Sequence, residues 1–207
     1  NHMPIEWTQI NSVISVFAPL IGVWLGARLT WKREEARESA RNTKEIEYIA
    51  ILVGAHLDRF ATSCLHVALD DGTEDGRPAG TNGCNAPTVS SPTIDPLELD
   101  VNWKELPVAL MYDILNIPNT IDDLEHQIME VYEKDGPPDY WDFFAARQHG
   151  YAVLGLEVSG LAQRLRKHAA LPVPPAIQGT WIRDDQLREQ MRKMDRQKKN
   201  LPISRRL

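Results

Sequence analysis

The longest uncharged stretch of the chain lies near its beginning. Its 21 residues, Trp7–Ala27, contain no Asp, Glu, Lys or Arg. A helix of that length rises about 31 Å at 1.5 Å per residue, and the hydrocarbon core of a bilayer is about 30 Å thick. The pattern therefore predicts a single transmembrane helix over residues 7–29. A short segment, residues 1–6, precedes it and begins with what resembles the remnant of an expression tag.

Two other interpretations of this stretch explain it less well. A buried helix of a soluble domain rarely contains so many consecutive residues without a charge. A secretory signal peptide begins with basic residues and ends at a small-x-small cleavage site. Here Glu6 is the only charged residue before the apolar run, and Arg28-Leu29-Thr30-Trp31 occupies the place of a cleavage site. We therefore expect the segment to stay attached.

Basic residues flank the predicted span on one side only. Five Lys or Arg residues follow it within 28–41 and none precedes it, and such residues stay on the cytoplasmic side. This asymmetry predicts an outward N-terminus and a cytoplasmic C-terminal domain, at a membrane that we expect to be a bacterial inner membrane. The residues expected at the two membrane interfaces are Trp7, Arg28, Trp31, Lys32 and Arg33.

Small residues recur along one face of the predicted span. Ala18, Gly22 and Gly26 are spaced by four, so they stack on one side of a helix. The Gly22-x-x-x-Gly26 spacing lets two helix backbones approach closely in a membrane. It predicts association of the spans and hence a homo-oligomer, although glycine is common in membrane helices for compositional reasons alone.

After the span the pattern changes twice. Residues 30–42 are mostly charged and predict a juxtamembrane stalk. From residue 43 the apolar residues follow a seven-residue repeat, which indicates a long helix with one buried seam. That seam faces either a second copy, as in a coiled coil, or the rest of its own domain, and we expect the second. Its two columns are Ala50, Leu57 and Cys64, and Ile46, Val53, Phe60 and Val67.

Helical patterns dominate the remainder of the predicted bundle domain, residues 43–197. The exception is residues 70–101, rich in Gly, Pro, Ser and Thr, which we expect to be a loosely ordered loop, with a strand conceivable only within 87–101. Further helices are expected from 102 or 103 to Pro118, from a cap at Thr120 to Gly136, from Asp139 to Ala170, and from 179 or 180 to 197.

The predicted fold is therefore all-α. An N-terminal single transmembrane helix continues through the charged stalk into an antiparallel bundle of about four helices. Three glycines inside the helix that starts at Asp139 each lower helix propensity by about 1 kcal/mol, which suggests close contact with a neighbouring helix or a kink. They are Gly150, Gly155 and Gly160.

The formal net charge of −6 conceals an uneven distribution. Residues 42–187 carry a net charge of −13, which argues against a nucleic-acid-binding domain because phosphates would be repelled. Residues 188–207 carry +6 and end in a basic tail, residues 198–207. These cations are candidates to contact lipid headgroups or an acidic partner, unless they are only solvated. They include Arg188, Arg192, Lys193, Arg196, Lys198 and Lys199.

The residue types that carry chemistry are scattered. Asp123-x-x-His126 places two metal-ligand types on one helical face, but a bundle di-metal centre needs the pair twice, so no metal is expected. Ser159 lies on a helix and not on the turn that serine hydrolases use. In a cytoplasmic domain Cys64 and Cys84 should be free thiols, while an inverted topology would allow a bridge between them. We assign no catalytic, cofactor-binding or metal-binding residue.

These patterns favour a non-enzymatic, membrane-anchored interaction or scaffold protein with an unidentified protein partner. An oligomeric effector that perturbs the membrane, of the toxin or phage-defence type, is the alternative, with the bundle controlling the transmembrane helices. One helix without an ionisable residue in its middle makes a poor pore wall unless several copies assemble. An enzyme is the third and weakest hypothesis.

Overall fold

The computed structural model describes the backbone of residues 7–172 and 178–200. Side chains are described for Trp24, Arg28, residues 30–172 and residues 182–197. The chain divides into two compact units, residues 1–44 and residues 45–207 (hereafter the N-terminal unit and the bundle unit). The predicted segment 1–6 and the side chains of the predicted tail 198–207 lie outside the described residues.

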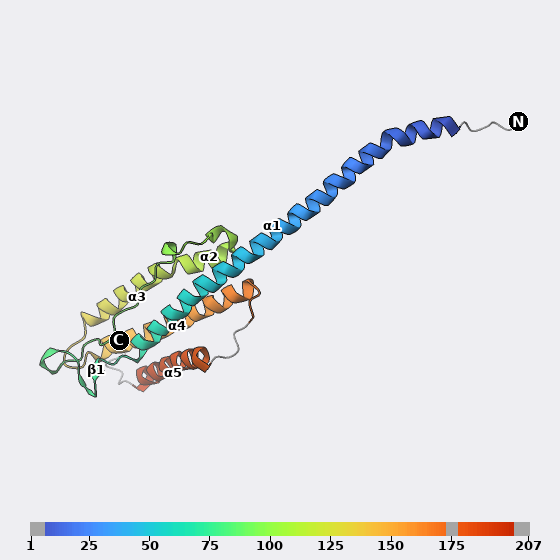
Figure 1. Ribbon diagram of the computed structural model, residues 1–207. Coiled ribbons are helices and arrows are strands. Elements are labelled where there is room, and N and C mark those ends of the chain that lie inside the picture. The colour runs from blue at the N-terminus through green and yellow to red at the C-terminus, as the bar shows by residue number, and fades with distance from the viewer. Residues whose placement is uncertain (1–6, 173–177, 201–207) are drawn as a thin grey trace. The chain divides into compact units, whose positions relative to one another are not determined.

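Helices make up nearly all the regular structure, which confirms the all-α prediction (Figure 1). They are α1 (Trp7–Leu69), α2 (Val108–Leu115), α3 (Ile117–Tyr132), α4 (Trp141–His168) and α5 (Gln178–Asn200). Over the residues that the structure describes, no helix is long and apolar enough to cross a membrane.

The predicted seam on α1 is buried inside the bundle unit. Ala50, Leu57 and Cys64 in one column, and Val53 and Val67 in the other, are each at most 1% exposed. Thr43 is exposed, so the buried part of the seam begins inside the bundle unit. The seam packs in the same core cluster as residues of α2 to α5. The expectation that it faces its own domain is therefore confirmed.

Helix α4 packs against α5 and against α3, and Gly155 shows how closely its neighbours approach (Figure 1). A Cβ atom at Gly155 would lie 3.0 Å from the Cβ of Cys64 on α1 and 3.1 Å from a methyl group of Leu187 on α5. The prediction of close packing is thus confirmed at Gly155. It is confirmed at Gly150 as well, where an added Cβ would lie 2.4 Å from a methyl carbon of Leu124 on α3. At Gly160 nothing lies within 4 Å of an added Cβ, so the structure offers no packing reason for that glycine.

The boundaries of α2 and α3 differ from those predicted. Trp103–Glu105 forms a 3₁₀ turn, and α2 begins only at Val108. Pro118 lies in the first turn of α3, where its missing N–H would have no helical partner in any case. The predicted break between the two helices is therefore present but falls at Asn116, two residues before Pro118, and the expectation that Thr120 caps the second helix is wrong.

The start of α4 is also set differently. Asp139 does not cap it; Tyr140, with φ of 45°, precedes the first helical residue. The carboxylate of Asp135 instead accepts a hydrogen bond from the backbone N–H of Phe143 at 2.9 Å. Asp135 and Phe143 are eight residues apart, so the cap comes from the far side of the turn and has no local sequence signature.

Two strands of two residues interrupt the long loop after α1. Strand β1 (Thr73–Glu74) pairs antiparallel with β2 (Arg77–Pro78), with Thr73 opposite Pro78. The Asp75-Gly76 dipeptide between them has positive φ at both residues, as a tight hairpin turn requires. The expectation that a strand could form only within residues 87–101 was wrong, and this Asp-Gly dipeptide was the overlooked signal.

Candidate functional site

The predicted membrane-interface residues are solvent-exposed where the structure describes them. Arg28, Trp31, Lys32 and Arg33 are all exposed, and Trp31 is 82% exposed. The guanidinium of Arg28 lies 5.0 Å from the ring centroid of Trp24, within the range of a cation–π contact. The predicted positions Trp7, Ala18, Gly22 and Gly26 lie outside the described side chains.

A buried carboxylate organises the loop that follows α1. The side chain of Asp70 is 1% exposed and forms an ion pair with Arg147 of α4 at 2.8 Å. It also accepts hydrogen bonds from the backbone N–H groups of Gly72, Thr88 and Val89 and from the hydroxyl of Thr88. The residues that close this loop onto the bundle are therefore Asp70 and Arg147, 77 positions apart.

The surroundings of Asp70 favour its charged form. Burial by itself would raise the pKa of this carboxyl, but the hydrogen bonds from Thr88, Gly72, Val89 and Arg147 outweigh burial and lower the pKa below its usual value. Arg147 also donates to the carbonyl oxygen of Val89, so one guanidinium binds both Asp70 at the start of the loop and Val89 within it. The loop expected to be loosely ordered is thus fixed to the bundle at this point.

A second charged network fastens α5 to α1 and α4. Arg183 and Asp184 are each 5% exposed, and Arg183 Nε donates to Asp184 Oδ1 at 3.0 Å. Arg183 also donates to the backbone carbonyl and the carboxylate of Asp58 on α1, which in turn pairs with Arg166 of α4. Ser159 of α4 completes the network. We call these five residues the α5 clasp.

The hydroxyl of Ser159 forms its hydrogen bonds inside the clasp. It donates to the Asp184 carboxylate at 2.8 Å and accepts from Arg183 Nη2 at 2.8 Å. Ser159 is 1% exposed, so no substrate reaches it, and we assign it a structural role. The sequence predicts the last helix but not that two of its charged residues, Arg183 and Asp184, are buried.

A third polar contact joins the long loop to α3 and α4. Ser91 Oγ donates to Glu125 Oε1 at 2.7 Å, and the hydroxyl of the fully buried Tyr151 donates to the same oxygen. Burial, followed by the hydrogen bond to Glu125, raises the pKa of the Tyr151 hydroxyl, which stays protonated as a donor at neutral pH. Glu125 therefore serves the fold, although it precedes the exposed His126 that suggested metal chemistry.

The other residues weighed for chemistry are separated from one another. His126 lies 3.5 Å from Glu130, one turn further along α3, and both are largely exposed. Cys64 is fully buried and its pKa is raised to about 12, chiefly by burial, whereas Cys84 is half-buried; both thiols are free. Within the described ranges, no three His, Cys, Asp or Glu residues converge as a metal site would require.

A hollow lined largely by aromatic and apolar side chains lies where α3 ends and α4 begins. The rings of Tyr132 and Tyr140 stack with centroids 5.3 Å apart, and Phe143 meets Tyr132 edge-on at 5.1 Å. Desolvation, and then the neighbouring Tyr132, raise the pKa of Tyr140. The hollow has a volume of about 210 Å³ and is lined by Asn85, Ala86, Pro87, Met129, Tyr132, Tyr140 and Phe143.

The predicted basic residues on α5 are exposed and partly paired. Arg188 bonds Asp185 at 2.9 Å, Arg196 bonds Glu189 at 2.5 Å, and Arg192 lies 3.6 Å from Glu189. These are surface pairs, which typically contribute less than about 1 kcal/mol. Lys193 is exposed, and the side chains of Lys198 and Lys199 lie outside the described residues.

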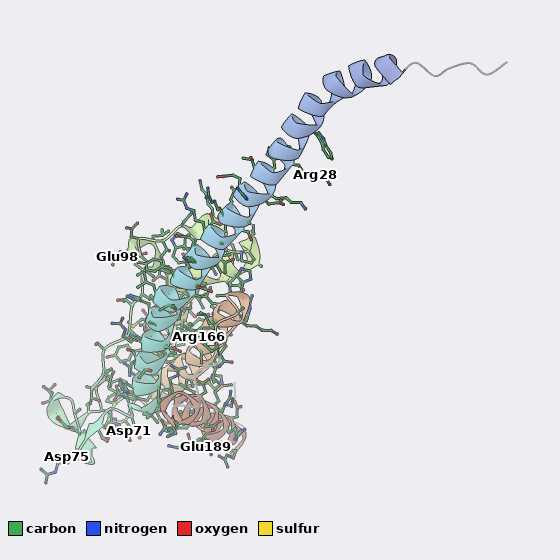
Figure 2. All side chains as sticks on the ribbon, turned by 45° about the vertical axis from the view of Figure 1, so that its right-hand side comes forward. Arg28, Asp71, Asp75, Glu98, Arg166 and Glu189 are labelled. Atoms are coloured by element: carbon green, nitrogen blue, oxygen red, sulfur yellow. The ribbon has the colours of Figure 1, made fainter. Side chains whose placement is uncertain are left out.

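This part of α5 lies at the end of the bundle unit where α1 terminates. Gln190 donates to the side chain of Gln148, which donates to the carbonyl oxygen of Asp70, the residue after α1. Figure 2 shows Glu189 and Asp71 toward the same end of the bundle unit and Glu98 toward the other. Residues Glu45–Leu69 of α1 span about 36 Å, so these bonds place Gln190 roughly that far from Glu45.

Comparison with protein-family models, curated proteins and solved structures finds no match. The assignment of fold class therefore depends on the geometry described above, which defines an all-α helical bundle.

Proposed function

We propose that this protein is a membrane-anchored, non-enzymatic interaction protein. In this proposal, residues 7–29 anchor the chain as a single-pass helix, and the bundle unit presents a protein-binding surface on the cytoplasmic side. The observation that carries it is the uncharged sequence Trp7–Ala27 followed directly by a basic flank. The polar groups of the bundle support the non-enzymatic part, because its buried charges are paired with one another.

The proposed orientation places the N-terminus outside and the bundle unit in the cytoplasm of a bacterial cell. Arg28, Lys32 and Arg33 support it, because cations next to a span resist translocation. Free Cys64 and Cys84 fit a reducing compartment, where disulfides are rare.

Self-association is part of the proposal. Ala18, Gly22 and Gly26 provide a small face on the anchor helix. On α1 in the bundle unit, Tyr48 is 53% and Ile51 61% exposed, so apolar surface also remains uncovered there.

The basic part of α5 is a candidate contact for an acidic protein partner or for anionic lipid headgroups, because Arg192 and Lys193 are exposed.

A fractionation experiment with the full chain tests the anchor. We expect the chain to remain with membranes after alkaline carbonate extraction. Replacing Leu20 and Ile21 together by Arg should release it, because an Arg near the bilayer centre costs about 2.5–3.5 kcal/mol each on insertion scales. The matched control replaces Ala36 and Ala40 by Arg in the exposed stalk and should leave the chain in the membrane. Recovery of the unaltered chain in the aqueous fraction would refute the anchor.

A mass measurement in detergent tests the association. We expect the unaltered chain to be larger than a monomer and Gly22→Leu to reduce its mass, because the leucine keeps two backbones apart. Val23→Leu, on a neighbouring face, should leave the mass unchanged. A strict monomer for all three proteins contradicts self-association. If expression of the unaltered chain collapses the membrane potential, the membrane-perturbing alternative replaces the scaffold.

A further inference from the structure

The aromatic hollow between α3 and α4 is the right size for one side chain. Its volume of about 210 Å³ is below the roughly 300–1,000 Å³ of small-molecule sites. Met129 and Tyr132 at its edge are 49% and 41% exposed, so apolar surface is open to solvent there. The shape suits an apolar residue of a peptide segment and is too small for a cofactor.

The surroundings of the hollow are acidic. Glu130, Glu133, Asp139 and Asp142 neighbour its lining residues in the sequence, and all four are exposed. From residue 117 to residue 146 the chain contains one Lys, Lys134, and no Arg. A segment that binds here gains from both an apolar side chain and positive charge, since opposite charges at a contact assist recognition.

Residues 201–207 have this composition. Their sequence, Leu-Pro-Ile-Ser-Arg-Arg-Leu, has four apolar residues, two Arg and no acidic residue. They follow α5, which runs antiparallel to α4: Arg183 bonds Ser159, and Gln190 bonds Gln148. The end of α5 therefore points toward the beginning of α4, where the hollow lies.

We propose that the hollow is a docking site for residues 201–207 of this chain. In this proposal Ile203 enters the hollow, and Arg205 and Arg206 lie near the exposed acidic residues named above. Three extended residues carry Ile203 about 10 Å from Asn200, which is about the spacing of two packed helices, and six carry Arg206 about 20 Å. The segment can therefore cross from the end of α5 to the neighbouring start of α4, where the hollow lies. The proposal holds with or without a membrane anchor.

A peptide-binding experiment tests both the site and its occupant. The probe is a fluorescein-labelled peptide with the sequence of residues 201–207, and the receptor is the chain ended after Asn200, with its helix content checked by circular dichroism. We expect saturable binding to this receptor and at least ten-fold weaker binding to the full chain. A tethered segment competes at an effective concentration of about millimolar, which accounts for the difference.

Charge and shape variants locate the contact. In the shortened chain, Glu133→Lys with Asp142→Lys should weaken binding several-fold at low salt, and Met129→Asp should weaken it at any salt. Glu98→Lys, toward the other end of the bundle unit, is the matched control and should change nothing (Figure 2). Equal binding to the shortened and full chains overturns the intramolecular occupant. Absence of binding to either chain, or equal loss with Glu98→Lys, overturns the docking site.

Discussion

Replacing Asp70 by Asn should destabilise the bundle unit far more than one lost hydrogen bond would. The carboxylate pairs with Arg147 Nη1 at 2.8 Å, and the two side chains are 1% and 4% exposed. Asn has the same shape but no charge, and its NH₂ group would face N–H donors. Removing one partner of a buried pair leaves the other charge uncompensated, which typically costs about 3–5 kcal/mol. We expect a loss of stability in that range.

Urea unfolding of the full chain in detergent, followed by tryptophan fluorescence and circular dichroism, measures this loss. The matched control is Asp95→Asn. Asp95 is exposed and accepts a hydrogen bond from the Leu97 N–H at 2.9 Å, and Asn caps a helix about as well as Asp. The control should therefore stay within about 0.5 kcal/mol of the unaltered chain.

A double variant separates the lost charge pair from the lost loop contacts. If the unpaired guanidinium causes most of the damage, adding Arg147→Met to Asp70→Asn should recover part of the stability. The remaining deficit would then measure the hydrogen bonds to Gly72, Thr88 and Val89. An Asp70→Asn variant within about 1 kcal/mol of the unaltered chain would refute the role that we assign to this carboxylate.

Three further predictions concern acid, glycine and thiols. The pKa of Asp70 is lowered on folding, so its charge contributes to the free energy of unfolding above the unfolded pKa of 3.8. This contribution is lost as the pH falls through the folded pKa. The difference in stability between the unaltered chain and Asp70→Asn should therefore narrow below about pH 4. Gly160→Ala should raise stability by about 0.5–1 kcal/mol in thermal unfolding, because nothing obstructs the added methyl, whereas Gly155→Leu should lower it by about 1–3 kcal/mol through overpacking. Maleimide at pH 7.5 should modify Cys84 well before Cys64, because burial and the raised pKa of about 12 keep the Cys64 thiol protonated and inaccessible. Intact-mass measurement should show the second adduct only in urea. Equal rates of modification would contradict the burial of Cys64.

Periodic features were predictable because they repeat at short range. The seven-residue columns on α1 identified Ala50, Leu57 and Cys64 as buried. Each is set by a spacing of three, four or seven residues on a helix. Such spacings leave a pattern in any window of about 15 residues.

The polar interior left no such pattern. Asp70 and Arg147 are 77 positions apart, and Arg183 is 125 positions from Asp58. The chain has 29 acidic and 23 basic residues, so local sequence cannot single out the pairs that tertiary packing brings together. Arg183 and Asp184 lie on the predicted last helix, and no local pattern indicated that they are buried. The start of α4 was mispredicted for the same reason. The residue that caps it, Asp135, accepts its hydrogen bond from Phe143 across a turn and leaves no local pattern.

The α5 clasp suggests why a polar helix is used to close this bundle. A buried ion pair often contributes less stability than apolar residues of the same volume, so the clasp is a weak source of net stability. It is nevertheless demanding in geometry, because Arg183 must reach Asp58, Asp184 and Ser159 at once. A shift of α5 by one turn would bury these charges without partners, whereas Leu187 could slide to another apolar contact at little cost. We infer that the apolar contacts attach α5 and that the clasp fixes its register.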